Sequence, residues 1–287
     1  MPERYKLGSI ACPSGILVAL DVGYLWLWSG TSTPQPHFSG SEDAETRAAI
    51  QSMRDYRIVG PDAVRTADIA NMVAINSSRF IYDLPEPGRD ALLAKINQGA
   101  STNGLDAHVE QEPTRVPHRV RAQRAADLGG GDFFMEGPMV VALGGIPNRP
   151  LPVTAERLDF GGNVGSRWGE VTVTVSTGRP ERSQLVGYFG VDYGTALVGD
   201  ADSLSDRRVE VELRQQIERG GRFAVGTCRV GGATVLGMDN SWGDGIFPVY
   251  ADRDASGQLV SVRLVLGDDG RRQLAEKVWE RAQREGS

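Results

Sequence analysis

The sequence predicts an α+β fold with a mainly antiparallel β core, a helical insertion and a C-terminal helix. Segments rich in Val, Ile, Tyr and Trp lie towards both ends of the chain, helical patterns concentrate in the middle, and the two do not alternate as regular β-α-β units. We expect a single α+β domain over residues 1–287, in which 1–40 and 132–287 form the β core and 41–131 the helical insertion. Two separate lobes are the alternative.

The composition is that of a soluble globular protein. Of 287 residues, 24% are charged and 40% hydrophobic, and the 36 Gly and 15 Pro indicate many turns. The formal net charge of -6 disfavours attraction to nucleic acid or to anionic membranes. We therefore expect the partner to be another protein or a small molecule.

Cysteine usage and hydropathy both favour a cytoplasmic protein. Cys12 and Cys228 are too few for a disulfide scaffold or for a zinc site built from cysteines. The N-terminus has no apolar segment of the signal-peptide type, and no stretch approaches the roughly 18 to 20 apolar residues of a membrane span.

The N-terminal segment is predicted to contain strands followed by a helix. Residues 7–28 are rich in β-forming side chains, and turn residues at 13–15 predict that two runs pair as a hairpin. Residues 29–40, rich in Ser, Thr, Pro and Gly, are typical of an exposed connector. Residues 41–54 begin with acidic side chains and carry Arg later, as the dipole of a helix favours.

Shorter helices are predicted across the middle of the chain. They are residues 61–73, 88–97 and 116–128, and in 88–97 the apolar side chains recur at three- to four-residue spacing on one side. Residues 98–117 have almost no apolar periodicity and are predicted to form a long surface loop. The three glycines at 129–131 should end the helical part.

Strands dominate the remaining sequence. Residues 139–143, 170–176 and 185–198 carry β-branched residues, with clear alternation in the second segment. Residues 207–220 fit both an alternating strand and a helix with one apolar stripe, and we favour the helix.

Two hairpins and a last helix complete the prediction. The first hairpin joins residues 222–230 to 233–236 across a Gly-Gly pair, and the second joins 246–251 to 259–266. Residues 269–284 carry apolar side chains on one side of a predicted amphipathic helix.

Two distant Asp-x-Gly segments each follow an apolar run and are the first candidate site. They are Asp21 with Gly23 and Asp192 with Gly194. The structural interpretation is that each Asp accepts hydrogen bonds from turn amides while the Gly bends the strand, and this is the favoured one. The functional interpretation places both carboxylates in one cleft, as an acid and base or as ligands of a divalent cation.

Two further polar clusters follow. Asp200 and Asp202 would suit a cation if extended, but also the start of a helix, which we favour. Residues 239–245 combine Asp, Asn and Gly with a Trp that offers a stacking face, or else form a turn with the Trp in the core. The ligand-binding candidates are Asp21, Asp192, Tyr193, Asp200, Asp202, Asp239, Asn240, Trp242 and Asp244.

Several kinds of catalytic chemistry are poorly supported. His37, His108 and His118 accompany no nucleophile elbow and no zinc-binding helix motif, and Cys228 fits a core position. No phosphate-binding glycine motif follows a predicted strand. We therefore expect no cofactor and no metal, and no catalytic residue is assigned. The basic residues at 115–124 could contact phosphate or an acidic partner, but a solvated helix face is the favoured interpretation.

Part of the chain resembles a known family. Residues 188–202 (YFGVDYGTALVGDAD), 241–250 (SWGDGIFPVY), 254–262 (DASGQLVSV) and 7–21 (LGSIACPSGILVALD) are similar to bacterial uncharacterised proteins of the DUF4241 type. The resemblance covers the N-terminal strand segment and the C-terminal third. It implies a bacterial, cytosolic, β-rich domain, and it brings no established activity with it.

These observations lead to one preferred function and two alternatives. An acidic globular chain without a catalytic constellation favours a non-catalytic, bacterial cytosolic protein that binds another protein, as an accessory or immunity-like partner. The alternatives are a metal-dependent or small-molecule enzyme with a cleft lined by Asp and Trp, and a ligand-binding module without turnover. Whether Asp21, Asp192 and Asp244 lie within about 6 to 8 Å of each other decides whether a site exists.

Overall fold

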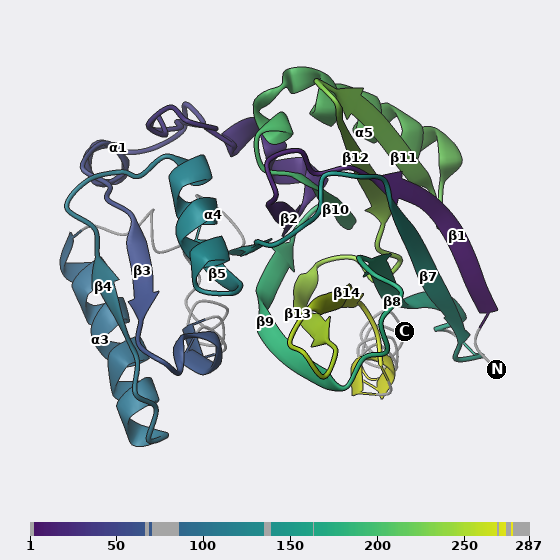
Figure 1. Cartoon of the computed structure of the whole chain (residues 1–287). Helices are drawn as coiled ribbons and strands as arrows, with labels where there is room; N and C mark the ends of the chain where they lie inside the picture. The colour runs from purple at the N-terminus through teal and green to yellow at the C-terminus, as the bar shows by residue number, and fades with distance from the viewer. Residues whose placement is uncertain are drawn as a thin grey trace.

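Two six-stranded antiparallel sheets face each other in the computed structural model of the chain (Figure 1). The structure describes residues 3–66, 69–70, 86–134, 139–162, 164–268, 270–273 and 277. The strands of these two sheets come from residues 3–20 and 131–265. The predicted α+β class with a mainly antiparallel core is confirmed. The division into one domain or two lobes stays a prediction.

The first sheet joins the N-terminal strand to strands from the second half of the chain. Its order is β1 (Glu3–Ile10), β7 (Leu151–Asp159), β8 (Ser166–Thr174), β14 (Leu259–Val265), β13 (Gly245–Arg253) and β9 (Arg182–Val191). Neighbouring strands are antiparallel throughout. Burial alternates along β8, where Val171 and Val173 are buried and Thr172 and Thr174 are half-buried, as expected for a strand with one face in the core.

The second sheet contains the strands that are buried on both faces. Its order is β11 (Val225–Val230), β12 (Ala233–Asp239), β10 (Thr195–Asp200), β2 (Leu17–Leu20), β6 (Met139–Leu143) and β5 (Gly131–Phe134). Every residue of β2 and β6 is buried. Alternate side chains of these strands belong to two different hydrophobic clusters, one on each face of the sheet. Both faces are therefore covered, which explains why the sequences of these strands are continuously apolar.

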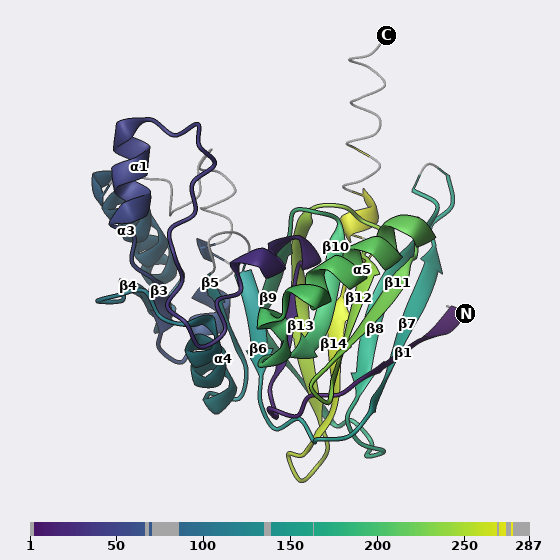
Figure 2. The ribbon, with the colours of Figure 1, turned by 90° about the horizontal axis from the view of Figure 1, so that it is seen from above.

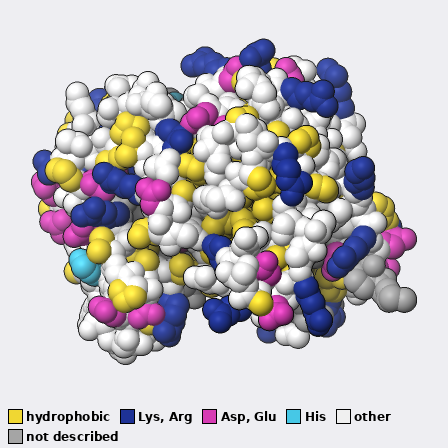
Figure 3. All heavy atoms as spheres, viewed as in Figure 1, with side chains coloured by type: hydrophobic (Ala, Val, Ile, Leu, Met, Phe, Trp, Pro, Cys, Tyr) yellow, Lys and Arg dark blue, Asp and Glu magenta, His cyan; other side chains and the backbone are white. Residues whose placement is uncertain are grey.

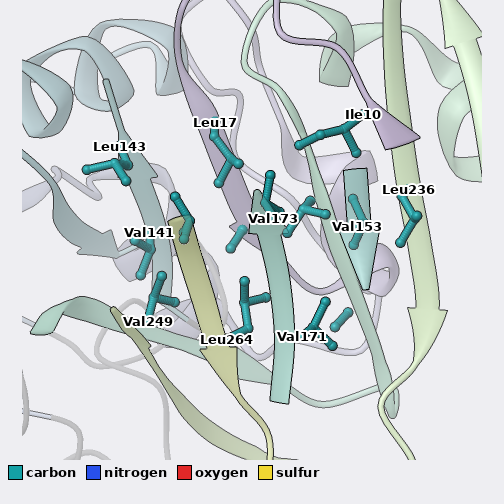
Figure 4. Close-up of a cluster of buried hydrophobic side chains, with 14 of the residues drawn as sticks. Ile10, Leu17, Val141, Leu143, Val153, Val171, Val173, Leu236, Val249 and Leu264 are labelled. Carbon is teal, nitrogen blue, oxygen red and sulfur yellow. The ribbon is translucent and has the colours of Figure 1, made fainter. Parts of the chain in front are cut away.

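The main core lies between the two sheets (Figure 4). Val153, Val171 and Leu264 of the first sheet and Val141 and Leu236 of the second are all fully buried there. Each Val or Leu buried in this way contributes about 1.5 to 3 kcal/mol relative to an exposed side chain. Their packing fixes the two sheets relative to each other.

Helix α5 (Arg207–Gly220) covers the outer face of the second sheet over β11 and β12 (Figure 2). Its stripe of Val209, Leu213 and Ile217 is buried, which confirms the predicted helix. The side chain of Gln216 binds the N–H and the C=O of Thr227 at 3.0 Å each, in the manner of a neighbouring strand. This contact occupies the edge of β11.

A group of shorter elements lies beside the sheets. It comprises α1 (Ala44–Gln51), β3 (Tyr56–Val59), α3 (Glu86–Thr102), β4 (His108–Gln111) and α4 (His118–Asp127), with β3 and β4 paired antiparallel (Figure 1). These elements confirm the helices predicted within residues 41–54, 88–97 and 116–128.

A buried ion pair connects α4 to this group. Arg121 Nη1 lies 3.1 Å from Asp55 Oδ1, and its Nη2 donates to the Tyr56 carbonyl at 2.8 Å. Both side chains of the pair are almost fully buried. The second oxygen of Asp55 accepts the Val116 N–H at 2.6 Å. Loss of one partner would leave a buried charge uncompensated, so the pair fixes how α4 contacts β3.

The hairpin predicted within residues 7–28 is wrong. Strand β1 pairs with β7, whereas β2 pairs with β10 and β6, so the turn at residues 13–15 carries the chain from one sheet to the other. The residues after Asp21 form the 3-10 helix η1 (Val22–Leu27) instead of a strand. The Asp21 side chain accepts the Gly23 N–H, which starts this helix.

The long surface loop predicted for residues 98–117 is also wrong. Helix α3 continues to Thr102, and β4 lies within the predicted loop. Asn97 donates to the Val109 carbonyl at 2.9 Å and accepts its N–H at 2.6 Å, and Ala100 is buried. The hydrogen bonds between Asn97 and Val109 join two different elements, so they give residues 98–117 no apolar periodicity that the sequence could reveal.

The β-rich half agrees better with the sequence. Both predicted hairpins form, as β11 with β12 and β13 with β14. The single strand predicted at 185–198 is two strands, β9 and β10, and β5 and β7 were not predicted. Of the predicted helix at 269–284, residues 270–273 and 277 are described and helical, and the others lie outside the described residues. Within 61–73, residues 63–66 and 69–70 are helical, and 67–68 and 71–73 lie outside them.

Candidate functional site

Asp21 brings the two Asp-x-Gly segments together. Its Oδ2 accepts the N–H groups of Asp192 and Tyr193, each at 2.8 Å. Its Oδ1 accepts the Gly23 N–H at 2.8 Å and the Thr195 hydroxyl at 2.6 Å. The two distant segments therefore meet through one carboxylate, at the turn between β9 and β10.

The environment of Asp21 is that of a structural group. The side chain is fully buried, and burial raises its pKa, while the four hydrogen bonds to the carboxylate act in the opposite direction. A carboxylate offers about four acceptor positions, and here four donors use them. This geometry supports the structural interpretation of the Asp-x-Gly segments, with Asp21 as the tie between them.

The turn held by Asp21 presents an exposed aromatic ring. Tyr193 is 55% exposed, and its ring lies so close to Gly23 that a Cβ at that position would come within 2.2 Å of it. The Tyr24 hydroxyl donates to Asp192 Oδ2 at 2.7 Å, and the rings of Tyr24 and Tyr193 meet edge to face with centroids 5.5 Å apart. An aromatic pair is thus held at the surface in a defined geometry.

Helix α5 supplies a cation to the same place. The guanidinium carbon of Arg214 lies 5.5 Å from the centroid of the Tyr193 ring, and Arg214 Nη2 donates to the Gly23 carbonyl at 3.2 Å. Arg214 Nε lies 3.1 Å from a carboxylate oxygen of Glu210, one turn earlier on the helix. We call Tyr24, Asp192, Tyr193 and Arg214 the Tyr193 surface.

The loop at residues 239–245 joins this turn through its backbone. The Asn240 N–H donates to the Gly194 carbonyl at 3.0 Å. The buried Asn240 side chain accepts the N–H groups of Trp242 and Gly243 at 2.8 and 2.9 Å and donates to the Gly243 carbonyl at 2.7 Å. Asn240 therefore shapes the loop and has these internal partners rather than a ligand.

Trp242 is a packing residue of this loop. Its indole N–H donates to the Trp168 carbonyl at 2.7 Å, and its ring lies against Gly267, where a Cβ would come within 2.1 Å. Asp239 accepts the Phe223 N–H at 2.8 Å. Asp244 is exposed at the outer end of the loop. The loop thus borders the Tyr193 surface without adding a stacking face to it.

Asp200 and Asp202 do not act together. The buried Asp200 accepts the N–H groups of Ser14 and Asp202 at 2.7 and 3.0 Å. The exposed Asp202 pairs with the guanidinium of Arg119 and precedes the short 3-10 helix η3 (Ser203–Ser205), whose N–H groups it does not cap. The N-cap of α5 is Asp206, which accepts the Arg208 N–H at 2.9 Å.

A metal ion would have to be held by a group of His, Cys, Asp or Glu side chains. Within the described ranges, no three His, Cys, Asp or Glu side chains are grouped so as to hold a metal ion. His118 stacks on Trp28, and its Nδ1 accepts the Ser29 N–H at 3.0 Å. Burial lowers the pKa of His118 to about 3, so it is neutral at ordinary pH.

Sequence reasoning missed two members of the Tyr193 surface. Tyr24 directly follows Gly23 in the first Asp-x-Gly segment, so an aromatic residue next to the predicted bend was the available signal. Arg214 lies on the polar side of α5, and its role depends on how that helix packs against η1. Nothing local to Arg214 predicts that contact.

Comparison with models of known protein families, with curated proteins and with solved structures found no match to the chain. The resemblance to the DUF4241 type stays a prediction. Among the residues that the structure describes, every helix is too short or too polar to span a bilayer.

Proposed function

We propose that the chain is a non-catalytic protein that binds another protein through the Tyr193 surface, as an accessory or immunity-like partner. The observation that carries this proposal is an exposed tyrosine residue, 55% accessible, whose ring is held between a second tyrosine and an arginine. Tyr, Trp and Arg are the residues most enriched among those that dominate the binding energy of protein interfaces.

The rigidity of the surface supports the proposal. Asp21 binds the backbone of Tyr193, Gly23 lies under its ring, and Tyr24 is fixed by a hydrogen bond to Asp192. Side chains that are ordered before binding lose little conformational entropy when a partner arrives. Trp26, which is 44% exposed and packs against His37, extends the exposed aromatic character of η1.

Charge suggests the chemistry of the partner. The chain carries a formal net charge of -6, so a partner with a basic surface would be attracted to it over long range. On the face shown in Figure 3, acidic and basic side chains are interspersed, with hydrophobic side chains exposed between them. The bacterial and cytosolic setting in this proposal comes from the family resemblance.

The two alternatives have less support. An enzyme or ligand-binding module with an Asp- and Trp-lined cleft would need free side chains, yet Asp21, Asp200 and Asn240 are engaged in internal hydrogen bonds. The ring of Trp242 is also engaged, because it packs against Gly267. Of the exposed candidates, Asp192 and Tyr193 lie in the β9–β10 turn and Asp244 at the end of its loop. Asp202 is paired with Arg119.

The test is a photo-crosslinking probe placed at Tyr193 and, in a matched control, at Leu128. Leu128 is 83% exposed at the end of α4 and is not part of the surface. We expect a basic protein to be captured at position 193 and not at 128. Its affinity is then measured for the wild type, Tyr193→Ala and Leu128→Ala.

Tyr193→Ala should weaken binding by about tenfold or more, the loss typical of a central interface residue, whereas Leu128→Ala should leave it unchanged. Both side chains are exposed, and a thermal melt of each variant checks its folding. Equal capture at the two positions, or full affinity of Tyr193→Ala, would contradict the proposal. Turnover of a small molecule by the pure chain would favour the enzyme alternative.

A further inference from the structure

A pocket of about 460 Å³ lies where the chain passes from the first sheet to the second. Strand β1 ends at Ile10, and the next residue, Ala11, exchanges two backbone hydrogen bonds of 3.1 Å with Thr234 of β12. The pocket is lined by this crossing, by the loop before β7 and by the turn between β11 and β12. Its volume is within the range of small-molecule sites in proteins.

The pocket opens at the border between the two sheets. Arg229 and Thr234 are directly paired across β11 and β12 and therefore share one face of the second sheet. Thr227 and Leu236, two residues along each strand, lie on that same face. A Cβ at Gly8 of β1 would be 3.8 Å from Thr227 and 3.6 Å from Leu236, so this face looks towards the first sheet.

The pocket is locally basic in an acidic protein. Among the described residues that line it, the charged ones are Arg149 and Arg229, and none is acidic. One N–H of Arg149 donates to the Val175 carbonyl, which anchors a guanidinium that has five N–H donors in all. Neither arginine forms an ion pair with a described residue. Asn148 and Ser9 add neutral polar groups to the lining.

The turn between β11 and β12 adds backbone donors. Gly231 and Gly232 have φ values of 53° and 88°, which the two central residues of a type I′ turn require. The pair of Val230 with Ala233 closes the hairpin, so the N–H groups of the two glycines take no part in the ladder. Backbone N–H groups without side chains in front of them are suited to bind an anion closely.

We propose that this pocket binds a small phosphorylated ligand, a phosphomonoester of about the size of a sugar phosphate. Arginine recognises phosphate oxygens through paired N–H groups, and two arginines with a Gly-Gly turn can contact several oxygens of one phosphate. The described residues that line the pocket include no aromatic side chain on which a nucleobase could stack. The polar Asn148 and Ser9 suit the hydroxyl groups of the rest of the ligand.

The test is a titration of the full chain with glycerol 3-phosphate and, separately, with inorganic phosphate. Binding is followed by calorimetry and by the NMR amide signals of Gly231 and Gly232. The ester is expected to bind more tightly than phosphate and to shift both glycine signals. Arg229→Gln should weaken binding about tenfold or more, because it removes a charged donor.

Arg182→Gln is the matched control, since Arg182 is an exposed strand arginine that does not line the pocket. It should bind the ester like the wild type. Arg149→Gln should also lose affinity, and a thermal melt separates this loss from any effect of the Val175 contact on folding. The proposal is overturned if neither ligand binds at millimolar concentration, if phosphate binds as tightly as the ester, or if Arg229→Gln and Arg182→Gln behave alike. The pocket and the Tyr193 surface share no residue, so either proposal can fail alone.

Discussion

Asp21 Oδ2 accepts the Tyr193 N–H at 2.8 Å, although 172 residues of sequence separate the two. The contact connects a fully buried carboxylate to the exposed Tyr193. The group that stabilises the junction between η1 and the β9–β10 turn therefore also positions the ring proposed to bind a partner. Stability and binding should respond together to changes at this junction.

Replacement of Asp21 should be strongly destabilising. Asp21→Ala leaves three backbone N–H groups and the Thr195 hydroxyl without their buried acceptor, and we expect a loss of about 3 to 5 kcal/mol in the free energy of unfolding. Urea denaturation measures it. The control Asp244→Ala, at an exposed loop position, should change stability by less than about 0.5 kcal/mol. Similar losses for the two variants would show that the Asp21 contacts contribute little.

A methyl group at position 23 should displace the exposed ring. In Gly23→Ala the new Cβ would lie 2.2 Å from the Tyr193 ring and 2.7 Å from its Cβ, so the side chain has to move. We expect a loss of stability of about 1 to 3 kcal/mol, together with weaker partner binding. Gly131→Ala is the control, because its nearest contact would be an ordinary 3.6 Å. Full partner affinity in Gly23→Ala would mean that the position of the ring does not matter for binding.

The stability of the protein should fall with rising pH because of Asp132. Burial raises the pKa of its carboxyl to about 8 from an ordinary value near 3.8, and a hydrogen bond from the Tyr188 N–H only partly opposes this. Its Oδ2 has no hydrogen-bond partner among the described residues. The folded state therefore holds a proton that the unfolded state has released between about pH 4 and pH 8.

The sign of the effect follows from this difference. The contribution of protonated Asp132 is fully present below the unfolded pKa and is lost as the pH rises towards about 8. Asp132→Asn cannot ionise, so its denaturation midpoint should depend less on pH over this range than that of the wild type, and it should be the more stable protein near pH 8. Parallel pH profiles for the two proteins would refute the assignment.

The fold was predictable from sequence where contacts are local. The hairpins β11–β12 and β13–β14 follow from short turns between alternating strands, and the stripe on α5 separated helix from strand. The pairing of β1 with β7 was not predictable, because turn residues at 13–15 show that the chain bends but not which strand it will join. The packing of Asn97 on Val109 is non-local in the same sense.

In the candidate site, too, local features were predictable from the sequence and contacts between distant segments were not. The Asp-x-Gly pattern correctly raised the question whether Asp21 and Asp192 meet, and they do, through a side chain and a backbone amide rather than through two carboxylates. For the loop at 239–245 the sequence left open whether Trp242 offers a stacking face or packs in the core, and in the structure the half-buried indole donates to the Trp168 carbonyl. Arg214 joins Tyr193 only because α5 docks beside η1, which no local pattern encodes.

The arrangement of β2 has a consequence for synthesis on the ribosome. Its neighbours are β6 and β10, and residues 17–20 pair with 197–200. The ribosome adds about 5 to 20 residues per second, so β10 is synthesised roughly ten seconds or more after β2. During that interval its backbone groups are open to other chains. We therefore expect the yield of folded protein to rise when the chain is expressed at lower temperature or with added chaperones. The free energy of unfolding of the purified protein should not change.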